Sequence, residues 1–381
     1  MNTSKEYYSG FEIGPIRPPS EAQSLLLRIT RNCPWNKCRF CSLYKNESFS
    51  VRPTEHVLRD ISTLKRFIDE LEQAEKISLS EKRIVMQRLS EQDYLACQSA
   101  EMWRMNGKKS VFLQDANSMI IKSDDMVTIL NALRENFPDI ERITTYARSH
   151  TIARIKDEDL KRIADAGLNR IHIGMESACD KILDLVEKGV DKATHITAGK
   201  KVKQAGIELS EYFMPGLGGN EYWRENAIDT ADALNQINPD FIRIRTLAVP
   251  NNSLLSEDYK KGTFTRVNDE RAVEELLLFV NELKGIDSTI KSDHILNLIP
   301  EFEGKLPEDK QKMIEALEWF LNLDQSERNI FKIGRRTGIM NSIRHLDIDS
   351  KRTRVIELIN SNSINNDNID TVVEELMKNF I

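Results

Sequence analysis

The sequence predicts an α/β fold, a partial (β/α)6 TIM-like barrel with a helical C-terminal appendage. Two observations predict this class. Short apolar runs alternate with longer amphipathic stretches over the first 300 residues, and this alternation is typical of βαβ units around a parallel sheet. After residue 300 the sequence becomes charged and helical, with few β-branched runs. Six strands are too few for a complete eight-stranded barrel, so we expect an incomplete one.

The expected strands are short, apolar and bounded by turn or helix signals. The first covers residues 24–30 and ends abruptly before a cysteine-rich loop over residues 31–53. Five later strands are expected at residues 110–115, 142–148, 170–177, 208–214 and 241–249.

The segments between these strands have helical spacing. A charged helical region over residues 54–106, with a break near residues 78–80, precedes the second strand. Glycines mark the ends of two later helices. These helices are expected near residues 124–135, 157–166, 192–204 and 223–236. We therefore divide the chain into an irregular lead-in, a barrel and a helical region, over residues 1–20, 21–300 and 301–381.

Composition excludes several classes of protein. The 381 residues are 40% hydrophobic and carry 54 Lys and Arg against 60 Asp and Glu, a net charge of −6. This balance argues against disorder and against a protein that coats nucleic acid, so we do not expect a nucleic-acid partner. We expect no membrane span, because no apolar run approaches about 18 residues. Residues 1–11 do not read as a signal peptide, and we expect a cytoplasmic protein.

The cysteines carry most of the chemical information. There are five, an odd number in a large chain, which argues against a disulfide framework. Cys33, Cys38 and Cys41 have the spacing C-x4-C-x2-C. Three thiolates can hold three irons of a [4Fe–4S] cluster and leave the fourth iron open to a small molecule. The alternative is a structural zinc site with His56 or Cys97 as fourth ligand.

This segment resembles the radical S-adenosylmethionine (SAM) superfamily. The similarity lies in a three-cysteine loop directly after the first strand, with Phe40 just before Cys41. The usual spacing there is C-x3-C-x2-C, so this chain has one extra residue between Cys33 and Cys38. We expect that residue to change the loop's shape and not its number of ligands. The resemblance covers about residues 20–300 and is broadly to the branch with oxygen-independent coproporphyrinogen oxidase and the methylthiotransferases.

The resemblance implies two cofactors, a [4Fe–4S] cluster and SAM. In that family the open iron binds the amino and carboxylate groups of SAM. Reductive cleavage then yields methionine and a 5′-deoxyadenosyl radical, which abstracts hydrogen from a substrate. An external electron donor such as flavodoxin or ferredoxin is implied as well. The substrate, a small molecule or a macromolecule, is not identified by the sequence.

Two SAM contacts are carried over at the end of the fourth strand, Glu176 and Ser177. In this strand His172, Gly174 and Glu176 share one face, where Gly174 leaves room and Glu176 can accept hydrogen bonds from a ribose or an ammonium group. The alternative for Ser177 is a helix cap. Glu211 and Tyr212, in the fifth strand, are further residues that can reach this cavity.

Three more strand ends supply candidate SAM contacts. Arg148 ends the third strand, and Arg245 lies in the sixth. Either guanidinium suits the SAM carboxylate, and an acidic group of the substrate is a second candidate partner for Arg245. The alternatives are a structural salt bridge for Arg148 and a solvent-facing edge strand for Arg245. Asp115 ends the second strand, where the family often keeps a Gly-Gly-Glu stretch that holds the SAM amino group. The glycines are missing here, but the carboxylate can accept from an ammonium.

Other motifs have simpler interpretations. We expect Cys97 and Cys179 to be buried small side chains, His294 to be structural, and the pair Arg335 and Arg336 to be solvated charges. Two other functions remain open. One is a non-catalytic iron–sulfur or zinc protein that transfers electrons or binds a partner, and the other is a radical SAM enzyme that modifies tRNA.

Overall fold

The computed structural model describes residues 6–378, so residues 1–5 of the predicted lead-in and residues 379–381 of the predicted C-terminal region lie outside it. The described chain forms two compact units. The first contains residues 6–34, 46–173 and 201–209, and the second contains residues 35–45, 174–200 and 210–378.

Parallel strands form the centre of the first unit. β1 (Leu25–Arg28), β4 (Ser110–Gln114), β5 (Arg142–Ala147) and the first residues of β6 (Arg170–Glu176) follow one another in that order, each parallel to the next. Their apolar side chains are buried, which explains why these runs form central strands.

A short antiparallel pair closes the cysteine-rich segment within the first unit. β2 (Thr30–Arg31) pairs with β3 (Ser50–Val51), with Thr30 opposite Val51. The sequence predicts a loop throughout residues 31–53, so this pair corrects that expectation. The pair was missed because two-residue strands carry no periodicity.

The predicted helical region after β3 consists of three helices. A first break falls at Ser78, as predicted, and a second at Asp93, and each of these side chains caps the helix that follows it. The helices of the first unit are α1 (Thr54–Ile77), α2 (Leu79–Gln92), α3 (Tyr94–Met105), α4 (Ser123–Asn136), α5 (Ser149–Ile152) and α6 (Asp157–Asp165), with short 3-10 turns at Pro19–Glu21 and Ser118–Ile120.

Three parallel strands and one antiparallel strand form the sheet of the second unit. β7 (Glu208–Phe213), whose first two residues belong to the first unit, β8 (Phe241–Ile244) and β9 (Thr289–Lys291) are parallel, and β10 (Gly304–Lys305) is antiparallel to β9. The expected sixth strand ends at residue 244 and not at 249, and β9 adds a parallel strand that was not among the six.

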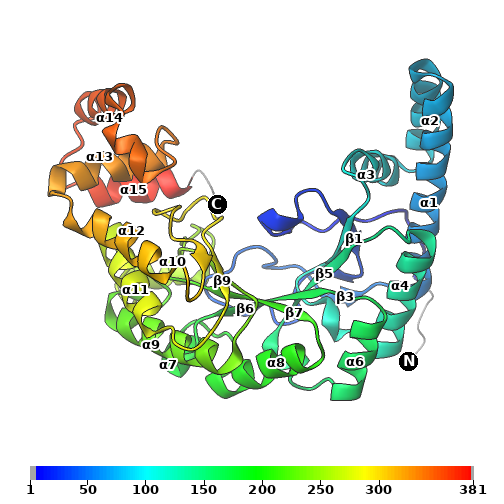
Figure 1. Ribbon diagram of the computed structural model, residues 1–381, viewed down its shortest axis with the longest axis horizontal. Helices are drawn as coiled ribbons and strands as arrows, with labels where there is room; N and C mark the ends of the chain where they lie inside the picture. The colour runs from blue at the N-terminus through cyan, green and yellow to red at the C-terminus, as the bar shows by residue number, and fades with distance from the viewer. Residues whose placement is uncertain (1–5, 379–381) are drawn as a thin grey trace. The chain divides into compact units, whose positions relative to one another are not determined.

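The second unit ends in the predicted helical appendage. α13 (Gln325–Arg336), α14 (Asp349–Ser361) and α15 (Ile369–Lys378) gather into one group (Figure 1). The other helices of this unit are α7 (Asp180–Leu185), α8 (Lys192–Gln204), whose last residues belong to the first unit, α9 (Gly219–Ile237), α10 (Leu254–Lys261), α11 (Asp269–Glu282) and α12 (Lys310–Asn322), with a 3-10 turn at Ile343–Asp347.

These elements confirm the predicted fold class, an α/β fold with parallel strands and a helical C-terminus. The expectation for Arg335 and Arg336 was wrong. Arg336 is buried and pairs with Asp269, and the Nε of Arg335 donates to the carbonyl of Leu298 over 2.8 Å. Among the described helices, none has the length and apolar character that crossing a membrane requires.

Candidate functional site

The three candidate iron ligands are divided between the two units. Cys33 belongs to the first unit, Cys38 and Cys41 to the second, and all three are partly exposed. Across residues 6–378, no three His, Cys, Asp or Glu side chains are gathered as an ion site. The thiols are therefore candidate iron ligands by their spacing and chemistry.

Residues 35–45, here called the loop tip, are fixed by hydrogen bonds within the second unit. The indole Nε1 of Trp35 donates to the carbonyl of Glu187 over 2.7 Å. Arg39 makes a two-point contact with the carboxylate of Asp258, with both distances 2.8 Å, and also reaches Glu187 over 2.9 Å. The backbone of Arg39 is held as well, because its N–H donates to Val186 and its carbonyl accepts from Leu255, each over 2.9 Å.

Phe40 attaches the tip to an apolar cluster. Its ring packs against a group of buried side chains from α7, α10 and the segments around them, and the ammonium of Lys188 lies 5.7 Å from the ring centroid. The cluster comprises Cys179, Ile182, Val186, Leu217, Leu247, Val249, Leu255 and Phe264. Phe40 therefore sets the position of the adjacent Cys41. Cys97 and Cys179 are buried, as expected.

Glu176 ends β6 in an unusual backbone conformation. Its φ is +67°, the left-handed region that side-chain-bearing residues rarely adopt and that is enriched at functional sites. Its Oε1 accepts from Lys188 over 3.4 Å, whereas its Oε2 is buried and has no hydrogen-bond partner among the described residues. Gly174 leaves room for this carboxylate, because a Cβ there would collide with Oε1.

Glu211 is a second buried carboxyl group near Glu176. It is fully buried, and neither of its oxygens has a hydrogen-bond partner among the described residues. Burial raises the pKa of Glu211 well above its usual value, and the charge of Glu176 raises it further, while Lys188 opposes the shift. Glu176, Glu211 and Lys188 thus bring two carboxyl groups and one ammonium group together inside the second unit, and the raised pKa favours the neutral form of Glu211.

The remaining candidates of the second unit have identified contacts. The hydroxyl of Ser177 accepts from the N–H of Cys179 over 3.1 Å, which is a local turn before α7, and the residue at the N-cap of α7 is Cys179 and not Ser177. The guanidinium of Arg245 stacks 4.8 Å from the ring centroid of Tyr212. Burial and the nearby Arg245 lower the pKa of His294 to about 4, so this histidine is neutral at pH 7.

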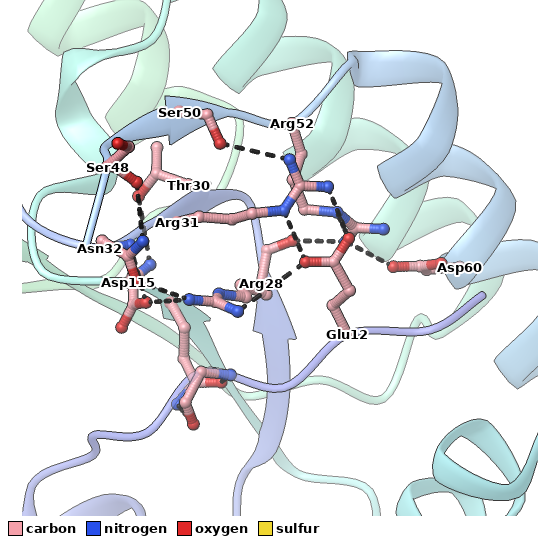
Figure 2. Close-up of polar contacts among 12 residues, drawn as sticks. Glu12, Arg28, Thr30, Arg31, Asn32, Ser48, Ser50, Arg52, Asp60 and Asp115 are labelled. Atoms are coloured by element: carbon pink, nitrogen blue, oxygen red, sulfur yellow. Dashed lines mark hydrogen bonds and ion pairs between the residues drawn. The ribbon is translucent and has the colours of Figure 1, made fainter. Parts of the chain in front are cut away.

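The carboxylate of Asp115, in the first unit, is bound by residues of that same unit. Its Oδ2 accepts from Arg28 over 2.8 Å and from the N–H of Asn32 over 3.1 Å, and the carboxylate is buried (Figure 2). Its Oδ1 lies against Gly14, where a Cβ would come within 2.9 Å. Asp115 therefore ties the residue before Cys33 to the end of β4.

Arg148 follows β5 in the same unit. Its backbone N–H donates to the side chain of Asn117 over 3.0 Å, and Asn117 in turn donates to Thr151 over 2.8 Å. The strand ends of β4 and β5 are thus joined, and the half-buried side chain of Arg148 remains the candidate carboxylate contact.

A hollow of about 320 Å³ lies at the carboxyl ends of β7 and β8 in the second unit. Pro215, Thr246 and Leu247 line it from the strand ends, and Asp370 and Glu374 line it from α15. Ligands of parallel α/β folds bind at this end of the strands, so the hollow is the candidate substrate pocket.

The donor set fits the cofactors that the sequence analysis expected. Thiols are the ligands of iron–sulfur clusters, and the unpartnered Oε2 of Glu176 is an acceptor of the kind that a ribose or an ammonium group requires. Sequence reasoning missed Lys188, Asp258 and Glu187, which hold the tip and Glu176. The sequence offered one signal for these contacts, the charged residue Arg39 between Cys38 and Cys41, which requires an acidic partner if it is buried.

Comparison with known proteins agrees with this chemistry. Residues 27–231, more than half of the chain, match the profile of the Radical SAM superfamily. Two curated relatives, from Methanocaldococcus infernus and Methanocaldococcus jannaschii, are each named tRNA uridine(34) acetyltransferase. They are 21% and 20% identical to this chain over 64% and 68% of its length, which is 46% and 49% of theirs. The chain therefore spans about half the length of these relatives.

A solved structure of coproporphyrinogen III oxidase from Escherichia coli is similar as well, with a TM-score of 0.43 and 14% identity over 65% of this chain and 50% of its own. The names of the two curated relatives do not support the expectation that a nucleic-acid partner is absent.

Proposed function

The chain belongs to the radical SAM superfamily, and from this premise we propose that Cys33, Cys38 and Cys41 hold its cluster while Glu176 and neighbouring groups orient SAM. Membership makes the chain an enzyme whose cofactors are a [4Fe–4S] cluster and SAM. The zinc and non-catalytic alternatives are set aside on the same ground. When bound, the cofactors supply reductive cleavage of SAM to methionine and a 5′-deoxyadenosyl radical that abstracts hydrogen from a substrate.

The chain's own residues would hold and orient the cofactors. The three thiolates bind iron, and Phe40 and Arg39 fix the tip that carries two of them. Glu176 would accept hydrogen bonds from SAM through its unpartnered Oε2. Arg148 or Arg245 would pair with the SAM carboxylate. Asp115 contributes mainly by fixing the chain before Cys33, because its Oδ2 already binds Arg28 and Asn32. Ser177 supports the turn that follows Glu176.

The three-cysteine segment in a chain of this family carries the proposal. The test is anaerobic reconstitution of the full-length protein with iron and sulfide, followed by addition of SAM and dithionite. We expect about four irons per chain, a cluster EPR signal that SAM changes, and release of 5′-deoxyadenosine. A cluster that is indifferent to SAM and yields no 5′-deoxyadenosine would contradict the proposal.

We further propose that the substrate is a tRNA. The names of the two curated relatives favour this class, over the two thirds of this chain that they match. The expected result is binding of unmodified tRNA that weakens steeply with added salt, and faster release of 5′-deoxyadenosine when tRNA is present. Equal rates with and without tRNA would contradict it. An external donor such as flavodoxin or ferredoxin and a cytoplasmic location complete the proposal.

A further inference from the structure

Residues 8–16 are tied along their length to other parts of the first unit. We call this segment the strap. Its contacts are side-chain to side-chain at one end and backbone to side-chain at the other. They are Tyr8 Oη to Asp60 Oδ1 (2.7 Å), Phe11 N to Asp93 Oδ2 (2.8 Å), Gly14 N to Gln114 Oε1 (2.8 Å) and Gln114 Nε2 to the carbonyl of Ile16 (2.6 Å). These hydrogen bonds therefore fix the strap against α1 at one end and against the end of β4 at the other.

Glu12, in the middle of the strap, lies among three guanidinium groups (Figure 2). Arg31 approaches it with two nitrogens, at 2.7 and 2.6 Å, and Arg52 lies 3.1 Å away. Arg28 is more distant, at 3.8 Å. Burial alone would raise the pKa of Glu12, but the hydrogen bond from Arg31 and the charge of Arg52 outweigh it and lower that pKa.

These arginines stand on both sides of the cysteine segment. Arg31 precedes Cys33 by two residues and belongs to β2, and Arg52 directly follows β3. The β2–β3 pair is the neck through which the chain enters and leaves this segment. Glu12 therefore binds both the entering and the leaving chain with one carboxylate.

The bridge between Arg31 and Arg52 at the neck depends on Glu12. The side chain of Arg52 is fully buried and has two carboxylate partners, Glu12 and Asp60. Arg28 is neutralised mainly by Asp115 at 2.8 Å. Without Glu12, the buried Arg52 would keep the carboxylate of Asp60, and Arg31 would keep Ser50 and Glu6, whose side chain is 41% exposed. Each arginine would then keep one carboxylate partner, but no carboxylate would join Arg31 to Arg52.

We propose that residues 8–16 act as a strap that fixes the neck of the cysteine segment, with Glu12 as the positioning residue for Cys33. The strap belongs to the predicted irregular lead-in, to which the sequence analysis assigned no role. The inference rests on the proposed function in one respect only, that Cys33 is an iron ligand.

The first test is hydrogen–deuterium exchange of the full-length protein, purified without cluster, as wild type, Glu12→Gln and Glu141→Gln. The control removes an exposed carboxylate that pairs with one lysine of the same unit, Lys109. In Glu12→Gln, we expect peptides covering residues 28–34 and 48–52 to exchange about tenfold faster than in the wild type, while α4 is unchanged. Equal neck exchange in Glu12→Gln and Glu141→Gln would overturn the proposal.

A second readout follows Cys33 itself. After anaerobic reconstitution, the cluster of Glu12→Gln should lose iron to a chelator about tenfold faster than that of the control, and Glu12→Asp should recover part of the loss. If Glu12→Gln does not fold, Arg31→Lys replaces it, because it keeps the charge and loses the two-point contact. A chelation rate unchanged in these variants would count against the proposal. Since the exchange measurement needs neither cluster nor SAM, a loosened neck in an enzyme that fails to cleave SAM would refute only the proposed function.

Discussion

The neck and the tip of the cysteine segment are held by different interactions. At the neck, Glu12 and Asp60 bind Arg31 and Arg52, so charge dominates. At the tip, the ring of Phe40 packs on an apolar cluster, and Arg39 adds one two-point ion pair. Charge pairs respond to pH and salt, whereas apolar contacts respond to changes of volume. The two regions can therefore be disturbed separately, although both serve the same three thiols.

The largest effect should come from removing one of the three thiols that the neck and the tip position. Cys41→Ala takes away one of three proposed ligands, and we expect loss of the cluster's absorbance and at least about a hundredfold loss of SAM cleavage. Cys179→Ala is the matched control, because that cysteine is buried in the cluster beneath Phe40. A Cys41→Ala protein that retains a full cluster would show that the ligand set is wrong.

Crowding the tip should have the next largest effect. Gly189 has a φ of +68°, and a Cβ there would collide with the ring of Trp35. Gly206→Ala is the control, because its φ of +79° is similar and no atom lies within 4 Å of the added Cβ. We expect Gly189→Ala to lower the free energy of unfolding by about 2 kcal/mol more than Gly206→Ala does, as measured by urea denaturation. Equal losses would mean that Trp35 does not fix the tip there.

The neck should be sensitive to acid. The folded protein lowers the pKa of Glu12 below its ordinary value of 4.5, so this carboxylate stabilises the fold above that pH and loses its effect as the pH falls through the folded pKa. The free energy of unfolding of wild type should exceed that of Glu12→Gln by about 1–2 kcal/mol at pH 7, and the two should converge as the pH falls through the folded pKa of Glu12. A difference that stays constant with pH would remove the charge explanation.

The smallest effect is expected at the tip's ion pair. Arg39→Lys keeps the positive charge but loses the two-point contact with Asp258, both of whose distances are 2.8 Å. Because the side chain of Arg39 is 24% exposed, we expect a loss of about 0.5–1 kcal/mol in the free energy of unfolding. Adding salt should shrink this loss, and a loss of several kcal/mol would mean that the tip depends on charge as the neck does.

Much of the fold was predictable because its signals are local. The strands at residues 110–115 and 142–148 are apolar runs, and Gly167 and Gly206 mark helix ends with φ of +108° and +79°. The three thiols could be predicted as candidate ligands in the same way, because their spacing is a short-range motif. The strap could not be predicted from the sequence, because Glu12 and Arg52 are separated by forty positions and no periodicity links them.

The partners of single charges were also hidden from the sequence. Arg335 and Arg336 read as solvated residues, yet each donates to carbonyls of the segment 296–298. Glu211 reads as a possible cavity residue, but only the structure shows that both of its oxygens are buried without a partner among the described residues. Burial and long-range pairing depend on the tertiary fold, and no local pattern encodes them.

The most direct measurement of the central claim is EPR of the reduced cluster, recorded with and without SAM on the full-length protein. An open iron that binds the amino and carboxylate groups of SAM should change the g values of the signal, and 5′-deoxyadenosine should then accumulate with reductant. A signal that is identical with and without SAM, together with no 5′-deoxyadenosine, would contradict the assignment of three thiol ligands and an open iron.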